Sequence, residues 1–243
     1  MDLNQDENAL LQHIREARER GEATIPKAEE LEVEVEGAYK VQAAMGEGRE
    51  VLGYKLGLIG LAKQAQMGID SPIYGRIYEG MILKSPMSLS SMIQPRLESE
   101  LAVVLGEDLP PGASPGAAHQ AIGGIFLAVD FLSSVWENYE FTAADVVADN
   151  ASGGRFLLGD RLLTEPLEGN LRLYHNGRLF TEGPVGDTGN VGERLAWLSK
   201  AVGGLKAGET IFVGSPAVAS EATPGTIELH GPRGSVLVAD LQE

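Results

Sequence analysis

The sequence predicts an α+β fold in which N-terminal helices precede a mixed, mainly antiparallel β core. Two observations predict it: helical periodicity dominates before residue 50, and short apolar, strand-like segments dominate after it. A chain of 243 residues is long enough to bury one core of this kind. We therefore expect an N-terminal helical segment over 1–50 and a β-rich domain over 51–243, joined in one compact unit.

The N-terminal helices are predicted from apolar spacing and from glycines that end each pattern. Over Asp6–Arg20, Leu10 and Ile14 recur at helical spacing among charged residues, and the pattern ends at Gly21. The aspartate that starts this segment suits an N-cap. A second helical pattern, over Glu36–Met45, is also followed by glycine. We expect the two helices to form a lid or packing unit.

Beyond residue 50 most segments favour strands. Val51–Leu58 reads as a strand with glycines at close approaches, Leu61–Gly68 as a short helix and Val191–Val202 as a long one. Asn176–Gly177 lies between two strand-like segments and predicts a type I′ hairpin. The other predicted strands are Leu97–Leu105, Ile122–Leu132, Arg155–Leu158, Leu171–His175, Arg178–Thr181, Thr210–Val213, Thr226–His230 and Ser235–Asp240.

Composition excludes several classes of function. The formal net charge is -16 and no run of Lys or Arg is present, so neither nucleic acid nor a membrane is an expected partner. The absence of cysteine excludes disulfides and thiolate sites. No signal-peptide pattern opens the chain, and the longest apolar segment, Gly123–Leu132, is too short to span a bilayer, so we expect a cytoplasmic protein. Nucleotide-binding and serine-hydrolase motifs are absent as well.

Three acidic residues on two predicted strands indicate a metal site. Glu98 and Glu100 project from the same side of one strand, and Asp130 lies inside another, very apolar strand. Carboxylates at such positions resist burial unless a cation or strong donors neutralise them. Oxygen ligands of this kind suit Mg²⁺ or Mn²⁺ and do not suit zinc. The alternatives are a solvated edge strand for the glutamates and a core ion pair for the aspartate.

Further candidate residues are a lysine and a polar turn. Lys55 sits in a glycine-flanked apolar strand, where burial implies a carboxylate partner or a catalytic role with a depressed pKa. A lysine that snorkels from a strand edge is the alternative. Asn150, Ser152 and Arg155 lie in a small, polar, glycine-containing segment that can present an amide, a hydroxyl and a guanidinium to an anion. As a bare pattern this segment is only a turn.

Five motifs follow one another in a fixed order along the chain: Gly53–Leu58, Ala62–Gly68, Ser71–Gly75, Gln94–Glu100 and Val146–Ser152. Together they resemble the hydratase/decarboxylase branch of the fumarylacetoacetate hydrolase superfamily. Its members are 2-oxopent-4-enoate hydratases and 4-oxalocrotonate decarboxylases of meta-cleavage aromatic catabolism. The resemblance covers about residues 35 to 160.

The resemblance implies a fold, a ligand set and an active-site lysine. The fold would be the mixed β-sheet roll of that superfamily. A divalent metal, Mg²⁺ or Mn²⁺, would be held by Glu98, Glu100 and Asp130, although the third family ligand is usually Glu. Lys55 matches the active-site lysine of the family.

One position favours the decarboxylases over the hydratases. Hydratases of this branch typically have an aspartate where this chain has Ile73, and isoleucine can neither transfer a proton nor handle water. The chain also departs from the family pattern over Gly186–Asn190, at Val213–Gly214 and over Ser215–Gly225. These departures affect the expected distal wall of the substrate pocket.

The resemblance therefore implies a lyase, with decarboxylation of a 2-oxo-3-enedioate such as 4-oxalocrotonate as the expected activity. Asn150 and Ser152 would hydrogen-bond the carboxylates of this 2-oxo acid, and Arg155 would hold its distal carboxylate. The alternatives are a hydratase of 2-hydroxypenta-2,4-dienoate, and a catalytically silent partner subunit. We also expect a homo-oligomer, with a complex between this chain and a pathway hydratase or decarboxylase as a further possibility.

Overall fold

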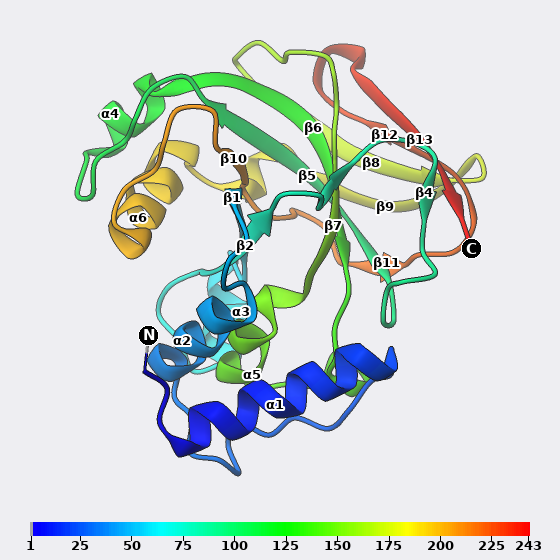
Figure 1. Ribbon diagram of the computed structural model, residues 1–243. Coiled ribbons are helices and arrows are strands. Elements are labelled where there is room, and N and C mark those ends of the chain that lie inside the picture. The colour runs from blue at the N-terminus through cyan, green and yellow to red at the C-terminus, as the bar shows by residue number, and fades with distance from the viewer. Residues whose placement is uncertain (1) are drawn as a thin grey trace.

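A computed structural model describes residues 2–243 and shows a β body above a layer of helices (Figure 1). Within these residues the helical layer contains α1, α2, α3 and α5, whereas α4 and α6 pack against each other at the side of the β body and contribute to its core. The helices are α1 Gln5–Arg20, α2 Val35–Met45, α3 Leu61–Gln66, α4 Pro115–Gln120, α5 Ala143–Ala148 and α6 Val191–Val202, with short 3-10 turns η1 Glu137–Tyr139, η2 Asn150–Ser152, η3 Val185–Thr188 and η4 Pro232–Gly234.

The β body consists of two sheets. The larger has the order β2-β1-β10-β5-β6-β7-β3, with β11 also paired to β5, and the smaller has the order β4-β13-β12-β8-β9. Among the strand pairs that the structure describes, β1–β10, β3–β7 and β4–β13 are parallel and the others are antiparallel, so the predicted mixed, mainly antiparallel sheet is confirmed. The strands are β1 Val51–Gly57, β2 Ile73–Tyr78, β3 Ile82–Leu83, β4 Met87–Ser88, β5 Arg96–Leu105, β6 Ile122–Leu132, β7 Gly153–Leu158, β8 Asn170–His175, β9 Arg178–Pro184, β10 Thr210–Phe212, β11 Ser220–Glu221, β12 Gly225–His230 and β13 Val236–Gln242.

The first helix begins earlier than its sequence pattern suggests. Asn4, and not Asp6, is the N-cap: its side chain accepts from the backbone N–H of Glu7, and the Glu7 carboxylate accepts from the N–H of Asn4. This capping box satisfies two backbone donors at once, which an N-cap at Asp6 does not offer. Gly21 ends the helix with φ 70°, a left-handed conformation that glycine adopts without strain.

Two apolar clusters hold the parts together. The main core lies between the sheets and under α6, and it includes Leu101, Leu173 and Leu195. A second cluster joins the helices to the β body: Leu10 and Ile14 of α1 pack there with the fully buried Trp136, whose indole N–H donates to the carbonyl oxygen of Asp145. The helical layer thus draws residues from far along the chain as well as from its N-terminal part.

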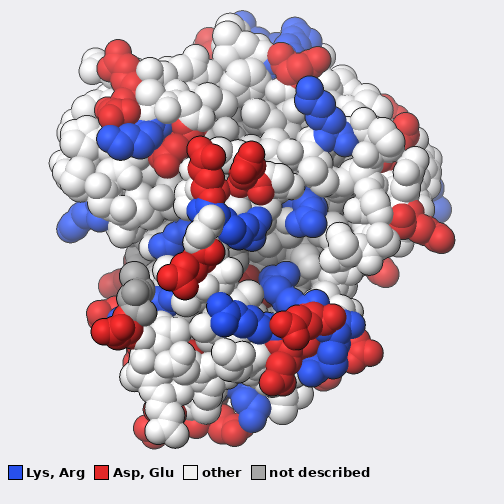
Figure 2. Space-filling model, viewed as in Figure 1, with Lys and Arg blue, Asp and Glu red and all other residues white. Residues whose placement is uncertain are grey.

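The helical layer and the β body meet along a hollow on one face of the molecule. Lys and Arg side chains gather around this hollow (Figure 2). The concentration of positive charge is unusual for a chain of net charge -16. None of the described helices is both long and apolar enough to cross a membrane.

Candidate functional site

Three carboxylates converge on one face of the larger sheet. Glu98 of β5 lies directly opposite Asp130 of β6 in the antiparallel register, so their side chains share a face. Glu100, two residues further along β5, shares that face because side chains alternate along a strand. One carboxylate oxygen from each residue lies within 4.8 Å of the others. Glu100 and Asp130 are fully buried, whereas Glu98 is only partly buried and lies toward solvent.

Lys55 enters the same cluster from β1. This strand runs parallel to β10, and β10 in turn pairs with β5, which brings Lys55 across the sheet toward the carboxylates. Its Nζ lies 2.8 Å from Oδ2 of Asp130 and donates to the carbonyl oxygen of Ala151 at 3.0 Å. The side chain is 2% exposed, so it does not snorkel to solvent.

Burial and mutual repulsion govern the protonation of the cluster. Burial raises the pKa of Glu98 to about 7. The positive charge of Lys55 lowers this pKa, and the negative charge of Asp130 raises it further. Burial likewise raises the pKa values of Glu100 and Asp130 above their ordinary range. For Lys55, burial acts to lower the pKa, but Asp130, Glu98 and Glu100 outweigh it and raise the pKa. The raised pKa runs against the alternative of a depressed lysine pKa, because the three carboxylates favour the charged form of Lys55.

Several buried oxygens of the cluster lack hydrogen-bond partners, and this property tests whether a cation fits. The backbone N–H of Gly214 donates to Oε2 of Glu100 at 2.8 Å. Oε1 of Glu100 and Oδ1 of Asp130 have no partner among the described residues. A buried, unpartnered carboxylate oxygen costs free energy unless a donor or a cation reaches it. One lysine faces three carboxylates, and all the free groups are hard oxygen donors, so the set fits a hard divalent cation.

The turn after α5 supplies the wall of the cluster. Asn150, Ala151 and Ser152 all have φ between 52° and 54°, a left-handed conformation that is strained for three successive non-glycine residues. The amide of Asn150 fixes this turn against β2: Oδ1 accepts from the N–H of Arg76 at 2.7 Å and Nδ2 donates to its carbonyl oxygen at 2.9 Å. A Cβ at Gly75 would overlap the carbonyl oxygen of Asn150. The strained backbone of this turn thus lies at Ala151, the residue whose carbonyl oxygen accepts from Lys55.

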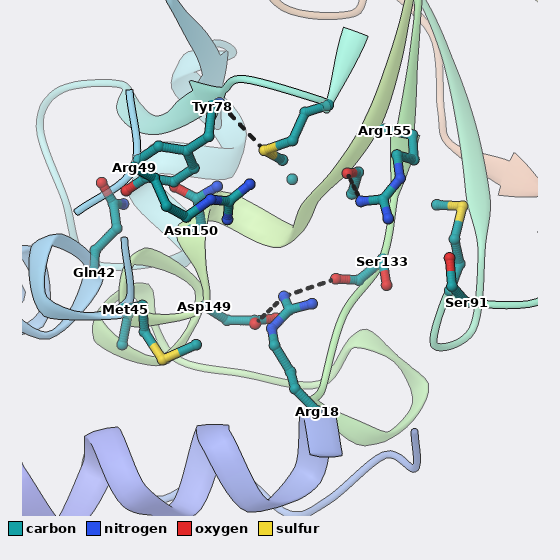
Figure 3. Close-up of a pocket in the computed structure, with 15 residues that line it drawn as sticks. Arg18, Gln42, Met45, Arg49, Tyr78, Ser91, Ser133, Asp149, Asn150 and Arg155 are labelled. Carbon is teal, nitrogen blue, oxygen red and sulfur yellow. Dashed lines mark hydrogen bonds and ion pairs between the residues drawn. The ribbon is translucent and has the colours of Figure 1, made fainter. Parts of the chain in front are cut away.

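The predicted substrate-binding residues do not all lie together. Both ends of the Asn150 amide are used by backbone, so its observed contacts are those of a positioning residue. The hydroxyl of Ser152 is buried with no partner among the described residues. Arg155 lies opposite Phe131, whereas Phe156 lies opposite Asp130, so Arg155 projects from the other face of the sheet. It lines a separate cavity with Arg18 and Arg49 (Figure 3), on the other side of the sheet from the carboxylate cluster, whereas its expected place is at the distal carboxylate of the substrate.

Sequence reasoning missed a cationic residue on the carboxylate face. Arg96 precedes Glu98 by two positions on β5 and therefore projects from the same face. Its guanidinium lies 3.9 Å from the ring centre of Tyr139, whose hydroxyl donates to the carbonyl oxygen of Gln94 at 2.9 Å. Burial raises the pKa of Tyr139, and Asp130 and Glu98 are among the charges that add to the shift. The alternation of β5 contained the signal that places Arg96 here.

Comparison with known proteins assigns the family. Residues 75–240 match the Fumarylacetoacetate (FAA) hydrolase C-terminal family, so the chain belongs to that family. The chain is 34% identical over 157 residues to 2-keto-4-pentenoate hydratase 1 of Dechloromonas aromatica (strain RCB), covering 61% of this chain and 60% of that protein. It is 37% identical over 118 residues to 4-oxalocrotonate decarboxylase of Pseudomonas putida, covering 47% of this chain and 45% of that protein. The chain thus aligns with less than two thirds of the length of each of these relatives.

The fold is shared with a solved decarboxylase. The structure of 4-oxalocrotonate decarboxylase from Pseudomonas putida G7, complexed with magnesium and adipate, superposes with a TM-score of 0.85 at 28% sequence identity and covers 96% of both chains. The predicted resemblance to the hydratase/decarboxylase branch is therefore confirmed, and so is the expected roll-like α+β fold. Relatives of both activities are similar to this chain to about the same degree.

Proposed function

We propose that this protein is a divalent-metal-dependent lyase that decarboxylates a 2-oxo-3-enedioate such as 4-oxalocrotonate. The carboxylate cluster carries the proposal, because one lysine faces the three carboxylates of Glu98, Glu100 and Asp130, and buried oxygens of the last two lack hydrogen-bond partners. The similarity to a decarboxylase complexed with magnesium and a six-carbon dicarboxylate supports both the metal and the class of substrate. Mg²⁺ and Mn²⁺ are the ions that such an oxygen-only set favours.

The metal would be held by Glu98, Glu100 and Asp130. When bound, a divalent ion supplies a Lewis acid that polarises the 2-oxo group and favours negative charge on its oxygen. Lys55 favours the ionised form of Asp130 through the 2.8 Å ion pair, and Asp130 in turn favours the charged form of Lys55, which offers positive charge and a hydrogen-bond donor. The buried Ser152 hydroxyl is available to donate to a substrate carboxylate.

The reaction breaks the bond between the distal carboxylate and its neighbouring carbon. The electron pair that carbon dioxide leaves behind moves through the conjugated chain to the oxygen of the 2-oxo group, and a proton from solvent completes the 2-hydroxydienoate product. We place Arg96, in preference to Arg155, at the distal carboxylate, since it projects from the same face as Glu98. The stacking of Arg96 on Tyr139 orients the guanidinium at the edge of the cluster.

Hydration of 2-hydroxypenta-2,4-dienoate is the second candidate, which the 34% identity to a 2-keto-4-pentenoate hydratase supports. Ile73 argues against it, because the position that is acidic in typical hydratases of this branch is occupied here by a side chain that is 3% exposed and packed in an apolar cluster. A catalytically silent partner subunit is the third reading. We further propose that the protein forms homo-oligomers.

One assay separates these readings. Purified protein with Mg²⁺ or Mn²⁺ is mixed with 2-oxohex-3-enedioate and, separately, with 2-hydroxypenta-2,4-dienoate. We expect release of carbon dioxide from the first, whereas loss of dienoate absorbance without it indicates a hydratase, and inertness toward both indicates a silent subunit. Glu98→Gln and Glu100→Gln are expected to abolish metal-dependent turnover. Glu107→Gln makes the same change at an exposed position next to β5 and is the matched control, for which we expect unchanged turnover.

A further inference from the structure

A cavity of about 130 Å³ lies between the helical layer and the β body, separate from the carboxylate cluster. Three arginines from distant parts of the chain line it: Arg18 near the end of α1, Arg49 between α2 and β1, and Arg155 on β7. The uncharged polar side chains of Gln42, Tyr78, Ser91, Ser133 and Asn150 and the carboxylate of Asp149 complete its polar lining. Figure 3 shows these three guanidinium groups around one space, and Figure 2 shows the basic surface at the same hollow. No metal-candidate carboxylate and no atom of Lys55 lines it.

The positive charge of this cavity is only partly neutralised. Arg18 is paired with the buried Asp149 at 2.5 Å, and the other oxygen of Asp149 accepts from the N–H of Val135 at 3.0 Å. Arg49 lies over the ring of Tyr78 at 4.3 Å, and Arg155 donates to the carbonyl oxygen of Gly154 at 3.0 Å. Among residues 2–243, no carboxylate lies within 4.0 Å of the side-chain nitrogens of these last two arginines.

Two guanidiniums without carboxylate partners are unexpected in this protein. With 35 acidic and 19 basic residues, the chain has acids to spare, yet none is placed against Arg49 or Arg155. Arg155 is partly buried, and burial lowers its pKa, with further lowering from Arg49 and Arg18. The three guanidinium groups therefore repel one another across the cavity. A dianion bound between them would offset this repulsion.

We propose that this arginine pocket, formed by Arg18, Arg49 and Arg155, binds a small dianion through its oxyanion groups. A cavity volume of about 130 Å³ accommodates inorganic phosphate or a four-carbon dicarboxylate. Arg49 and Arg155 supply the charge-assisted hydrogen bonds to the anion. Arg18 adds to the positive electrostatic potential of the pocket and holds Asp149 in place through their ion pair. The pocket adjoins the turn at Asn150 that walls the carboxylate cluster, but its three arginines are separate from the proposed metal ligands and from Lys55, and the proposal does not depend on the lyase activity.

The test locates the anion and measures its affinity. Crystals of the metal-loaded protein are soaked in selenate, whose anomalous signal marks its position, and the same preparation is titrated calorimetrically with phosphate and with succinate. We expect selenate between Arg49 and Arg155, and binding of phosphate, succinate or both. Tighter binding of phosphate identifies a phosphoryl ligand, tighter binding of succinate identifies a dicarboxylate, and either supports the pocket.

Matched variants make the result specific. Arg49→Gln and Arg155→Gln each remove one donor pair, and we expect each to weaken binding about 10- to 100-fold. Arg178→Gln removes an exposed guanidinium on β9 and is expected to leave the affinity unchanged. Selenate only at the carboxylate cluster, no binding of either titrant, or wild-type affinity in both pocket variants overturns the proposal.

Discussion

Removal of the Lys55 charge tests how the carboxylate cluster is balanced. Lys55→Met keeps a long, flexible side chain and deletes only the ammonium group. The change leaves Asp130 buried without its 2.8 Å partner and frees the carbonyl oxygen of Ala151. Since breaking a buried ion pair from one side costs about 3–5 kcal/mol, the metal-free variant is expected to lose that much free energy of unfolding at pH 8.

The loss has a distinctive dependence on conditions. At pH 5.5 the cluster can take up protons, because the pKa values of Glu98, Glu100 and Asp130 are all raised, so we expect a smaller loss there. Saturating Mg²⁺ is expected to narrow the gap at pH 8, since a divalent ion replaces the missing positive charge. The assay is urea unfolding followed by circular dichroism, at both pH values and with and without the metal.

Lys63→Met is the control, because Lys63 is an exposed lysine on the neighbouring helix α3. Its change in unfolding free energy is expected to stay within about 0.5 kcal/mol. The reasoning about the cluster is refuted if Lys55→Met costs less than about 1 kcal/mol at pH 8 or is indistinguishable from this control.

Three further predictions concern the turn and the titration of the cluster. Asn150→Ala removes both hydrogen bonds to the backbone of Arg76, and we expect a loss of about 1–3 kcal/mol in urea unfolding; an unchanged midpoint contradicts the assigned role. Gly75→Ala forces β2 away from the turn and should cost about 1–3 kcal/mol, whereas Gly60→Ala, with open space around it, should be neutral. Because folding raises the Glu98 pKa from 4.5 to about 7, the unfolded chain loses that proton first as pH rises. Metal-free stability should therefore fall across this interval, and the gain in melting temperature from Mg²⁺ should be larger at pH 8 than at pH 5.5; an equal gain at both contradicts the titration.

The sequence contains much of the metal cluster. A period of two places Glu98 and Glu100 on one face, and the apolar surroundings of Asp130 mark it as buried. What the sequence does not contain is the register, since pairing between β5 and β6 depends on contacts across the whole sheet. The unknown register also explains why the position of Arg155 is not predicted correctly from the sequence. Whether Arg155 shares a face of the sheet with Asp130 or with Phe131 follows only from the pairing of β6 with β7.

Other features depend on tertiary context alone. None of the three left-handed residues Asn150, Ala151 and Ser152 is a glycine, so the sequence does not indicate their conformation. Hydrogen bonds from Lys55 and with the backbone of Arg76 stabilise the turn. Strand β2 was not predicted because Gly75 and Arg76 interrupt its apolar pattern, although its neighbours supply the pairing. Helix α5 has six residues, and its capping box at Thr142 is stronger evidence for it than its periodicity. The hairpin at Asn176 and Gly177 is local, and its prediction is confirmed by positive φ at both residues.

The most direct test of the proposed metal centre is the position of a bound ion. Crystals grown or soaked with Mn²⁺ can be measured at a wavelength where manganese scatters anomalously. We predict one dominant anomalous peak within coordination distance of the carboxylate oxygens of Glu98, Glu100 and Asp130, absent from the Glu100→Gln variant. A wild-type crystal with manganese bound elsewhere, and no peak among these three carboxylates, contradicts the account.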